Sequence, residues 1–490
     1  MSWDWPHIVL FFVVPVLFLG TIIYVFVIGK SANKKDKKYQ VRFNMRNGRF
    51  KIDNIKRGAS IIGSAGSGKT ESVVHNFLQH FAKYHFSGVI HDYKDFELTE
   101  IAYPLFKDSE TKFYTIAFDQ IHYRVNPIAP RYLPNEESVN EVSRVLMENL
   151  LEQNLSENTG SNKFFSDAVE GLLAGLIWKM KTAYPDLCTL PHIIVLYQTM
   201  STKKLVAFLK SDFTSWNLAS AFINGIESEK QTAGIKSTLS NAFKKISSQK
   251  LFYVLSKDEV PLDINNPKNP SVISLVNHPK YDTVYSPVIA LILHTIIKQM
   301  SIRNRNSSFL LMEEAPTIKL PNMHRIPATL RSYDISTIYV MQDKIQNDLL
   351  YGDKASKAIL SNLSYQFFGK VNDPDTAKYY ERFFEIIKKP TMSISKNSGF
   401  TLESRITKGE KEVSKRRADV FFRLKPGEFI AFADGKDKKI YLAPIELNNN
   451  NIKMLQPKYI TNVVLFNRSQ EIYLEIALTF NVSPIINKKS

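Results

Sequence analysis

Residues Gly63-Ser64-Ala65-Gly66-Ser67-Gly68-Lys69-Thr70 decide the fold, because they fit the pattern G-x-x-x-x-G-K-[ST]. The short apolar stretch 59–62 precedes them, and an amphipathic segment, residues 71–84, follows. A strand, a glycine-rich loop and a helix in that order predict a phosphate-binding loop, in which backbone N–H groups and the helix N-terminus surround phosphate oxygens. In such a loop Lys69 reaches the β- and γ-phosphates and the Thr70 hydroxyl binds Mg²⁺. The sequence therefore predicts a site for ATP with Mg²⁺.

Two adjacent carboxylates follow a second apolar stretch. Residues 308–312 predict a buried parallel strand, and Glu313 and Glu314 stand where that strand leaves the sheet. A phosphate-binding loop needs one acid there to hold Mg²⁺ and a second acid to orient the attacking water. The first acid is usually Asp, and Glu313 is one methylene longer. We therefore expect Glu313 to hold the metal with a different geometry and Glu314 to orient the water.

Further segments fit a doubly wound α/β sheet. Residues 88–94 predict the next strand, where we expect Asp92 to cap the following helix and Lys94 to be solvated. Another strand is predicted to end at Gln342, on the nucleotide edge, where an amide can sense the γ-phosphate. Arg331 precedes that strand and could reach a phosphate across a subunit boundary.

The composition is that of an ordinary globular chain. Of 490 residues, 44% are hydrophobic and 23% are charged, which excludes disordered and collagen-like proteins. A polytopic membrane carrier would be far more apolar. The length corresponds to about three domains. Cys188, the one cysteine, excludes a disulfide framework and a multi-cysteine metal site, and we expect it to be a small buried residue.

A long helical segment separates the predicted strands. Residues 132–250 show apolar residues at helical spacing, and residues 164–180 are almost without polar side chains on one face. A doubly wound sheet does not need so long an excursion between strands. We therefore predict an inserted all-α domain, with the apolar stripes of its helices forming the core.

The first thirty residues predict a membrane anchor. Residues 8–28 form a run of twenty-one residues without a charge, and a helix of that length spans about 30 Å, the thickness of a bilayer core. A cleaved signal peptide is the main alternative, but no Lys or Arg precedes the run and no small-residue cleavage site ends it. Residues 30–57 hold eleven basic side chains and two acidic ones, so the positive-inside rule places the following residues in the cytoplasm.

Two segments supply most of the formal net charge of +17. Residues 1–60 carry eleven basic and three acidic side chains, and residues 388–439 carry fourteen and seven. For the first segment, topology with contact to anionic headgroups is the simpler interpretation, and nucleic-acid contact is the alternative. The second segment predicts an exposed hairpin and loop. We hypothesise that it touches a DNA backbone through Lys415, Arg416 and Arg417.

Residues 313–332 resemble the Walker B region of the coupling proteins of type IV secretion and conjugation systems, most of all the TraG-like mobilisation ATPases. The resemblance covers roughly residues 55–445. Its landmarks are Glu313-Glu-Ala-Pro-Thr-Ile-Lys-Leu-Pro-Asn-Met-His-Arg-Ile-Pro-Ala-Thr-Leu-Arg-Ser332, His91-Asp-Tyr-Lys-Asp-Phe-Glu-Leu98, Arg124-Val-Asn-Pro127, Gln342-Asp343, Tyr351-Gly352, Asn362-Leu-Ser-Tyr-Gln-Phe-Phe-Gly369 and Lys425-Pro-Gly-Glu-Phe429. Members of this family are membrane-anchored, RecA-like hexameric ATPases that bring a relaxase–DNA complex to a secretion channel.

The resemblance implies a role for each site residue. The family's phosphate lysine falls on Lys69, its catalytic glutamate on Glu314, its trans-acting arginine on Arg331 and its γ-phosphate glutamine on Gln342. Family members commonly have Asp where this chain has Glu313, and many have two membrane helices where one is visible here. These departures bear on the turnover rate and on contact with the channel.

The predicted fold is an α/β, RecA-like P-loop ATPase with an inserted all-α domain and one N-terminal transmembrane helix. The expected parts are a transmembrane anchor (1–29), a basic juxtamembrane segment (30–57), a nucleotide-binding domain (58–131 and 251–446), the inserted domain (132–250) and a C-terminal appendage (447–490).

The resemblance implies a homohexameric ATPase that crosses the bacterial inner (cytoplasmic) membrane once and keeps its C-terminal bulk in the cytoplasm. Its partners would be single-stranded DNA with bound relaxase and the components of a type IV secretion channel. The alternative, which Glu313 favours, is an ATP-gated receptor that recruits secreted protein substrates and hydrolyses little ATP. A double-stranded DNA pump of the FtsK or HerA kind would share the core but lacks this set of landmarks.

Overall fold

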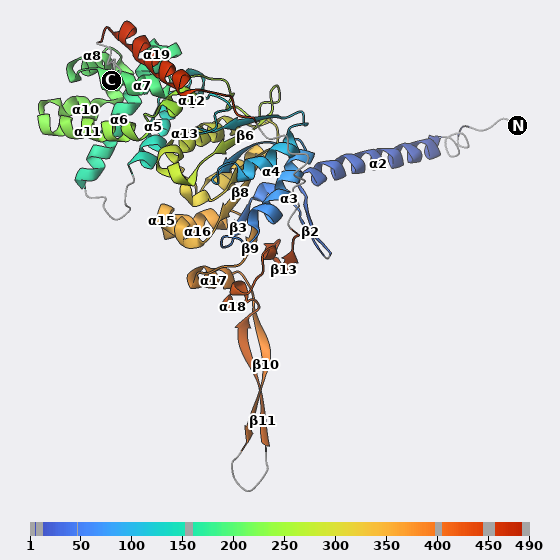
Figure 1. The fold of residues 1–490 in the computed structure, drawn as a ribbon. Helices are drawn as coiled ribbons and strands as arrows, with labels where there is room; N and C mark the ends of the chain where they lie inside the picture. Colours follow the sequence, from blue (N-terminus) through green and yellow to red (C-terminus); the bar gives the residue numbers. More distant parts are fainter. Residues whose placement is uncertain are drawn as a thin grey trace.

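A nine-stranded mixed sheet forms the centre of the molecule (Figure 1). The computed structural model describes residues 5, 13–46, 48–151, 160–396, 404–443 and 456–482, with residues 25–36, 160–164, 393–396 and 404–407 described by their backbone alone. The strand order is β13-β12-β9-β3-β8-β7-β4-β6-β5. The strands are β3 (Ala59–Ile62), β4 (Ser87–Asp92), β5 (Lys112–Ile116), β6 (Ser271–Val276), β7 (Ser308–Met312), β8 (Ile335–Met341), β9 (Tyr365–Phe368), β12 (Glu428–Ala433) and β13 (Lys436–Tyr441).

The strands from β9 to β5 run parallel, and β12 and β13 extend one edge in antiparallel fashion. Parallel strands need cover on both faces, and β3, β4, β6, β7 and β8 accordingly consist of buried residues alone. The aromatic side chains of α3 (His75–Lys83) pack on one face, where Phe81 stacks on Phe309 at 4.5 Å between ring centroids. The buried helix α13 (Asp282–Met300) belongs to the core on the other face, with Leu310 and Met312. The α/β prediction is confirmed.

The strand order assembles the candidate site. Strands β3, β8, β7 and β4 are consecutive neighbours, so their carboxyl ends lie side by side at one edge of the sheet. The phosphate-binding loop leaves β3, Gln342 follows β8, Glu313 follows β7 and Asp92 ends β4. Segments more than 200 positions apart along the chain therefore meet at this edge.

A helical unit occupies the chain between β5 and β6. Its helices are α5 (Glu136–Leu150), α6 (Gly160–Ala183), α7 (Leu190–Thr199), α8 (Thr202–Lys210), α9 (Phe213–Leu218), α10 (Ser220–Asn224), α11 (Glu229–Lys245) and α12 (Gln249–Leu255). Helix α6 contacts α5, α9, α10 and α11 and lies at the centre of the unit. The expected domain limit at residue 250 falls inside α12, whose Leu251 and Val254 are buried in the common core.

The C-terminal helix α19 (Asn462–Phe480) packs against α7 and α12 (Figure 1). It buries Leu465, Ile472 and Ile476, and the His192 Nε2 atom of α7 lies 2.6 Å from Glu475 Oε2. This part of the predicted appendage, residues 447–490, is thus joined to the helical unit. The linker predicted at residues 448–451 lies outside the described residues.

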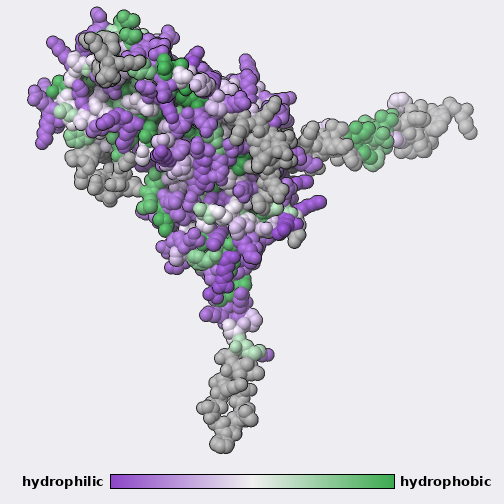
Figure 2. Space-filling model, viewed as in Figure 1, coloured by the Kyte–Doolittle hydropathy of each residue, from purple (hydrophilic) through white to green (hydrophobic). Residues whose placement is uncertain are grey.

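Helix α2 (Val14–Tyr39) extends away from the body of the molecule (Figure 1). Its apolar stretch Val14–Tyr24 is exposed and forms a hydrophobic zone on that arm (Figure 2). Among the described residues, the one helix that is long and apolar enough to cross a membrane by length and composition is Pro279–Met300, and it is a core helix whose apolar window is 78% buried. The exposed apolar face of α2 is therefore the feature that fits the predicted anchor.

The basic segment after the anchor is folded onto the sheet. Strands β1 (Val41–Asn44) and β2 (Arg49–Ile52) pair antiparallel and bury Val41, Phe43 and Ile52. Phe43 contacts Phe77 of α3 edge to face, with ring centroids 5.2 Å apart. The end of α2 is thus attached to the helix that follows the phosphate-binding loop.

A long hairpin, β10 (Ile386–Lys396) and β11 (Ser404–Ser414), projects from the sheet domain (Figure 1). This confirms the predicted hairpin, and residues 397–403 lie outside the described part of the chain. Helices α17 (Pro374–Glu381) and α18 (Ala418–Phe422) contact each other near its base. The other helices are α4 (Glu97–Phe106), α14 (Ile326–Leu330), α15 (Lys344–Tyr351) and α16 (Asp353–Ser361).

Candidate nucleotide-binding site

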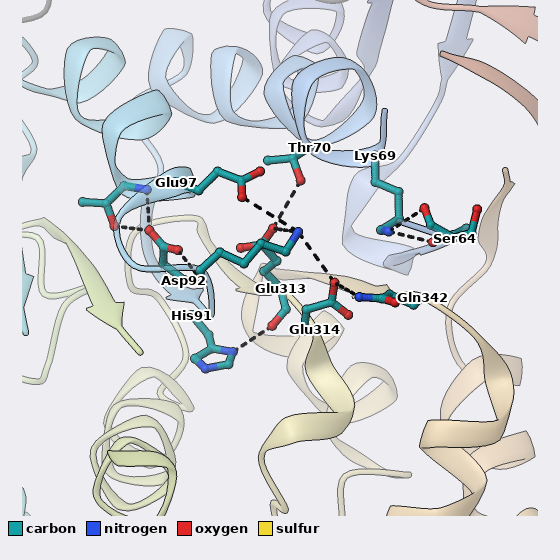
Figure 3. Close-up of polar contacts among 12 residues, drawn as sticks. Ser64, Lys69, Thr70, His91, Asp92, Glu97, Glu313, Glu314 and Gln342 are labelled. Atoms are coloured by element: carbon teal, nitrogen blue, oxygen red, sulfur yellow. Dashed lines mark hydrogen bonds and ion pairs between the residues drawn. The ribbon is translucent and has the colours of Figure 1, made fainter. Parts of the chain in front are cut away.

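The phosphate-binding loop is closed around its lysine. The Lys69 Nζ atom donates hydrogen bonds to the backbone carbonyl oxygens of Gly63 at 2.6 Å and Ser64 at 3.3 Å (Figure 3). The Lys69 residue is 6% exposed, and burial lowers its pKa. A helix of π type, Lys69–Val74, begins directly at this residue. The ammonium is therefore held inside the loop, where phosphate oxygens would replace the two carbonyl groups.

The loop needs glycine at two positions for its shape. Gly66 and Gly68 have φ angles of +70° and +85°, which side chains of L-residues rarely adopt. A Cβ atom on Gly68 would also lie 2.9 Å from the backbone nitrogen of Gly427, whose N–H donates to the Ser67 carbonyl at 2.9 Å. The turn before β12 thus packs directly on the phosphate-binding loop.

A hollow of about 190 Å³ opens at this edge of the sheet. Its lining residues from the loop and the helix after it are Ala65, Gly66, Ser67, Gly68, Lys69, Thr70, Glu71 and Ser72, and those from elsewhere are Lys94, Glu97, Gln342, Pro426 and Gly427. Besides the carboxylates of Glu71 and Glu97, the hollow has backbone amides, two ammonium groups and an amide side chain. These groups suit the phosphate end of a nucleotide.

Glu313 and Thr70 meet beside this hollow. The Thr70 Oγ1 hydroxyl donates to Glu313 Oε1 at 3.2 Å. Glu313 is 2% exposed, and burial together with the charge of Asp92 raises its pKa to about 7. The other carboxylate oxygen, Oε2, is buried and has no hydrogen-bond partner among the described residues.

The backbone of Glu313 is fixed by the neighbouring strand. His91 Nδ1 lies 2.9 Å from the Glu313 carbonyl oxygen, and the Glu313 N–H donates to the His91 carbonyl at 3.1 Å. Burial lowers the pKa of His91 to about 4, so the ring is neutral at pH 7 and its Nδ1–H donates. These two hydrogen bonds direct the Glu313 side chain toward Thr70.

Glu314 and Gln342 meet beside Glu313 (Figure 3). Gln342 Nε2 donates to Glu314 Oε1 at 3.0 Å, and Glu314 is 3% exposed. Glu314 has a φ angle of +43°, an uncommon conformation for a non-glycine residue. Strain of this kind is often found at functional sites. The loop, Glu313, Glu314 and Gln342 are therefore brought together as predicted.

Lys94 is the site residue that the sequence reasoning missed. Its Nζ atom lies 3.5 Å from Glu313 Oε1 and 3.7 Å from Glu314 Oε1, and 3.9 Å from Glu97 Oε2 (Figure 3). The expectation of a solvated lysine is therefore wrong. The signal in the sequence is its place at the carboxyl edge of the sheet, two residues beyond the end of β4.

Asp92 does form the expected cap. The Asp92 carboxylate accepts hydrogen bonds from Thr99 N at 2.7 Å, Thr99 Oγ1 at 2.6 Å and Lys94 N at 3.2 Å. It is completely buried, and burial raises its pKa to about 6. These hydrogen bonds hold the segment between β4 and α4, and with it the position of Lys94.

Arg331 lies away from these groups. It is exposed and precedes β8, whereas Gln342 follows the same strand. The seven residues of β8 correspond to about 23 Å at 3.3 Å per residue. Arg331 is therefore at the opposite edge of the sheet and cannot reach the phosphate-binding loop of its own chain.

The remaining groups suit a nucleotide with Mg²⁺. The loop presents Lys69 and backbone amides to phosphate, and a hydroxyl and a carboxylate meet at Thr70 and Glu313. Oxygen ligands of this kind are those that Mg²⁺ prefers alongside nucleotide phosphates. The unpartnered Glu313 Oε2 is the kind of atom that a metal would satisfy.

Comparison with solved structures shows what fold this is. The bacterial conjugative coupling protein TrwBdeltaN70 in its unbound form matches with a TM-score of 0.62 at 13% sequence identity, over 86% of this chain and 90% of that chain. The plasmid coupling protein TrwB in complex with ADP and Mg²⁺ matches with a TM-score of 0.62 at 13% identity, over 83% and 88%. VirB4 of Thermoanaerobacter pseudethanolicus matches with a TM-score of 0.52 at 14% identity, over 83% and 96%. The chain thus shares the fold of the coupling protein TrwB and, less closely, of VirB4.

A comparison with curated proteins finds no match. The model of the family described as Type IV secretory system Conjugative DNA transfer matches residues 24–459, which is most of the chain. The match includes the phosphate-binding loop, both carboxylates and the hairpin. This chain therefore belongs to the conjugative DNA transfer family of type IV secretory systems, the coupling proteins.

Proposed function

We propose that this chain is a membrane-anchored ATPase that acts as a homohexamer. In this proposal it couples single-stranded DNA with bound relaxase to a type IV secretion channel. One observation supports this proposal above all: in a chain of this family, a single edge of the sheet brings together Lys69, Thr70, Glu313, Glu314 and Gln342. ATP and Mg²⁺ are the proposed cofactors.

The proposed reaction is phosphoryl transfer to water. Bound Mg²⁺ would supply positive charge that neutralises the β- and γ-phosphate oxygens. Lys69 would exchange its two carbonyl partners for phosphate oxygens, and the Thr70 hydroxyl and the Glu313 carboxylate would hold the metal. The Glu314 carboxylate accepts a hydrogen bond from the attacking water and orients it, while Gln342 holds that carboxylate in place.

The position of Arg331 supports the oligomer. Because Arg331 is exposed at the opposite edge of the sheet, any contact that it makes with a nucleotide would be at the site of a neighbouring subunit, as with trans-acting arginines in related phosphoryl transfer. Each site would then lie at a subunit interface, with Arg331 of the next subunit beside the γ-phosphate. A closed ring of such interfaces is the proposed hexamer.

The proposed location is the bacterial inner membrane. Residues 8–28 would cross it once, with the basic residues after Ile28 on the cytoplasmic side. The exposed apolar side chains of Val14–Tyr24, which form a hydrophobic zone on the arm (Figure 2), are consistent with a lipid environment.

The hairpin of β10 and β11 is the proposed DNA contact, but the residues that we propose to touch DNA differ from those expected from the sequence. Lys415 pairs with Glu385 and Asp437 at 2.8 Å, and the Arg416 Nε atom lies 2.9 Å from Asp437, so these two cations have acidic partners. Arg417 pairs with Asp419 at 3.4 Å. We therefore assign the three basic residues expected to touch DNA to ion pairs that stabilise the base of the hairpin.

Two other lysines are better placed for DNA. Lys389 and Lys411 are direct cross-strand partners and so project from the same face of the hairpin. Like charges placed opposite each other destabilise a hairpin unless an anion lies between or beside them. Both side chains are exposed, and a DNA backbone would supply the missing negative charge.

The first experiment is ATP turnover by the full chain in detergent, with and without single-stranded DNA, beside a Lys69→Ala variant. Stimulation by DNA that the variant abolishes is the expected result. Tight ATP binding without turnover, even with DNA present, would contradict the motor and support the receptor that recruits protein substrates. Glu313, which stands where family members commonly have Asp, is the feature that keeps that second candidate open.

The hairpin has a separate test. Lys389→Ala with Lys411→Ala should lower affinity for single-stranded DNA and reduce the slope of log affinity against log salt by about 1.4. The matched control, Lys388→Ala with Lys408→Ala, removes the same charge from the other face. An equal effect of both pairs would contradict recognition by the Lys389 face.

A further inference from the structure

The ammonium group of Lys94 occupies the space between two buried carboxylates. Its Nζ atom lies 3.5 Å from Glu313 Oε1 and 3.7 Å from Glu314 Oε1 (Figure 3). Glu313 Oε1 is also the oxygen that accepts the Thr70 hydroxyl. Lys94 and Thr70 therefore contact the same oxygen, Glu313 Oε1, and we assign the metal to Thr70 and Glu313.

Two carboxylates buried this deeply need a compensating cation. Glu313 and Glu314 are 2% and 3% exposed, and an isolated buried carboxylate is strongly unfavourable. Among the described residues, the base within 4 Å of both carboxylates is Lys94. Burial lowers the pKa of Lys94, but Glu313, Glu97 and Glu314 outweigh that effect and raise it, so the amine stays protonated.

A second cation cannot share this position without repulsion. An ammonium and a divalent ion on the same carboxylate oxygen would be only a few ångströms apart, where Coulomb repulsion is large. We propose that Lys94 holds the cation position between Glu313 and Glu314 in the nucleotide-free protein, so that a divalent ion enters only together with nucleotide phosphate. The assignment of these carboxylates to a nucleotide–metal site rests on the proposed function.

Glu97, the first residue of α4, is another acidic partner for Lys94 when its ammonium moves away from Glu313 and Glu314. Glu97 Oε2 lies 3.9 Å from Lys94 Nζ, and its side chain is 46% exposed at the hollow. Lys94 itself is 33% exposed, so its ammonium can turn toward Glu97 and the phosphates without crossing packed side chains. The proton stays on the amine throughout this exchange of partners. The unpartnered Glu313 Oε2 is then free to serve the incoming metal.

The test is binding of Mn²⁺ alone, measured on the full chain in detergent without nucleotide. Free Mn²⁺ is followed by electron paramagnetic resonance, and the thermal unfolding midpoint is recorded with and without Mg²⁺. We expect Lys94→Met to bind one Mn²⁺ per chain at least about tenfold more tightly than the wild-type protein, because the competing charge is gone. Lys94→Arg, which keeps the charge, should behave like the wild type, and Lys94→Met with Glu313→Gln should lose the new site.

The outcomes separate this inference from the proposed function. Equal Mn²⁺ affinity of the wild type and Lys94→Met would overturn it, as would a folded Lys94→Met protein that binds no Mn²⁺. If Lys94→Met fails to unfold cooperatively, Lys94→Gln is the second variant, since its amide can still hydrogen-bond both carboxylates. Binding of a fluorescent ATP analogue is measured on the same samples. Failure of all proteins to bind it, with the Mn²⁺ difference intact, would contradict the nucleotide site and leave the lysine's role standing.

Discussion

Gln342 donates a hydrogen bond to Glu314 at 3.0 Å across the gap between two neighbouring strands. The strand register explains this contact, since Met312 of β7 is opposite Tyr339 of β8. Glu314 is two positions beyond Met312, and Gln342 is three positions beyond Tyr339. Both side chains therefore lie just past the carboxyl ends of their strands, at similar distances from the last paired residues. The parallel pairing thus fixes the direction of the carboxylate that we assign to the attacking water.

Gln342→Ala should reduce ATP turnover by about tenfold without weakening nucleotide binding, because the Glu314 carboxylate loses the group that orients it. Steady-state hydrolysis and binding of a fluorescent nucleotide measure the two effects. Gln346→Ala, an exposed glutamine on α15, is the matched control and should leave both unchanged. A parallel loss of binding in Gln342→Ala would mean that the amide acts on nucleotide itself.

The stability of the nucleotide-free protein should depend on the protonation of Glu313. Its folded-state pKa, about 7, is raised above the ordinary value of 4.5, so the native state binds the proton more tightly than the unfolded chain. The free energy of unfolding therefore falls as the pH rises from about 4.5 through 7. Glu313→Gln removes this contribution, so its stability relative to the wild type should rise between pH 5 and pH 8 by on the order of 3 kcal/mol.

Urea unfolding at the two pH values, without metal or nucleotide, measures that difference. The titration of Asp92 occurs in both proteins and largely cancels in the comparison. Identical pH profiles for the wild type and Glu313→Gln would show that the carboxyl titrates near its ordinary value.

Arg331→Ala and Lys69→Ala should complement each other in mixtures. Each variant alone is expected to lack turnover, because the arginine of one subunit serves the phosphate-binding loop of the next. In an equal mixture of exchanging subunits, about a quarter of the interfaces would join an intact Lys69 to an intact Arg331, and activity should return in that proportion. Absence of any recovery, with mixed rings demonstrated by crosslinking, would argue for Arg331 acting elsewhere.

Gly68→Ala should destabilise the protein more than Gly435→Ala does. Both glycines have positive φ angles, +85° and +75°, but only the first would bring a Cβ atom to 2.9 Å from a backbone nitrogen, that of Gly427. Gly435→Ala should cost about 1 kcal/mol from its backbone conformation. Gly68→Ala should cost about 2 kcal/mol more, because the Gly427 backbone cannot yield as a side chain can. Thermal unfolding of both variants gives the comparison.

The sequence predicted the parts of the site that depend on strand ends. A strand end lies next to the glycine loop, to Glu313 and Glu314, and to Gln342. The carboxyl ends of neighbouring parallel strands lie side by side, so these residues come close together whatever conformation the loops adopt. Lys94 was missed because its contact depends on how a short loop folds back over two carboxylates from another strand. Burial and neighbouring charge decide that, and neither is visible in a local pattern.

The same limit explains the other differences. The contact between Gly427 and the phosphate-binding loop joins residues some 360 positions apart and follows from the antiparallel edge that β12 adds. The boundary expected at residue 250 falls inside α12, whose apolar residues belong to the same core as the helices before it. The docking of α19 rests on side chains of two separate segments, among them the buried His192 and the partly exposed Glu475.

That docking has a consequence for the design of shorter proteins. A fragment ending at residue 446 removes Leu465, Ile472 and Ile476 and exposes the surfaces of α7 and α12 that α19 covers. Such a fragment would present new apolar surface and a buried histidine without its carboxylate, which are conditions for aggregation. Soluble versions for biochemical work should be shortened at the amino-terminal helix and should retain the chain through Val482.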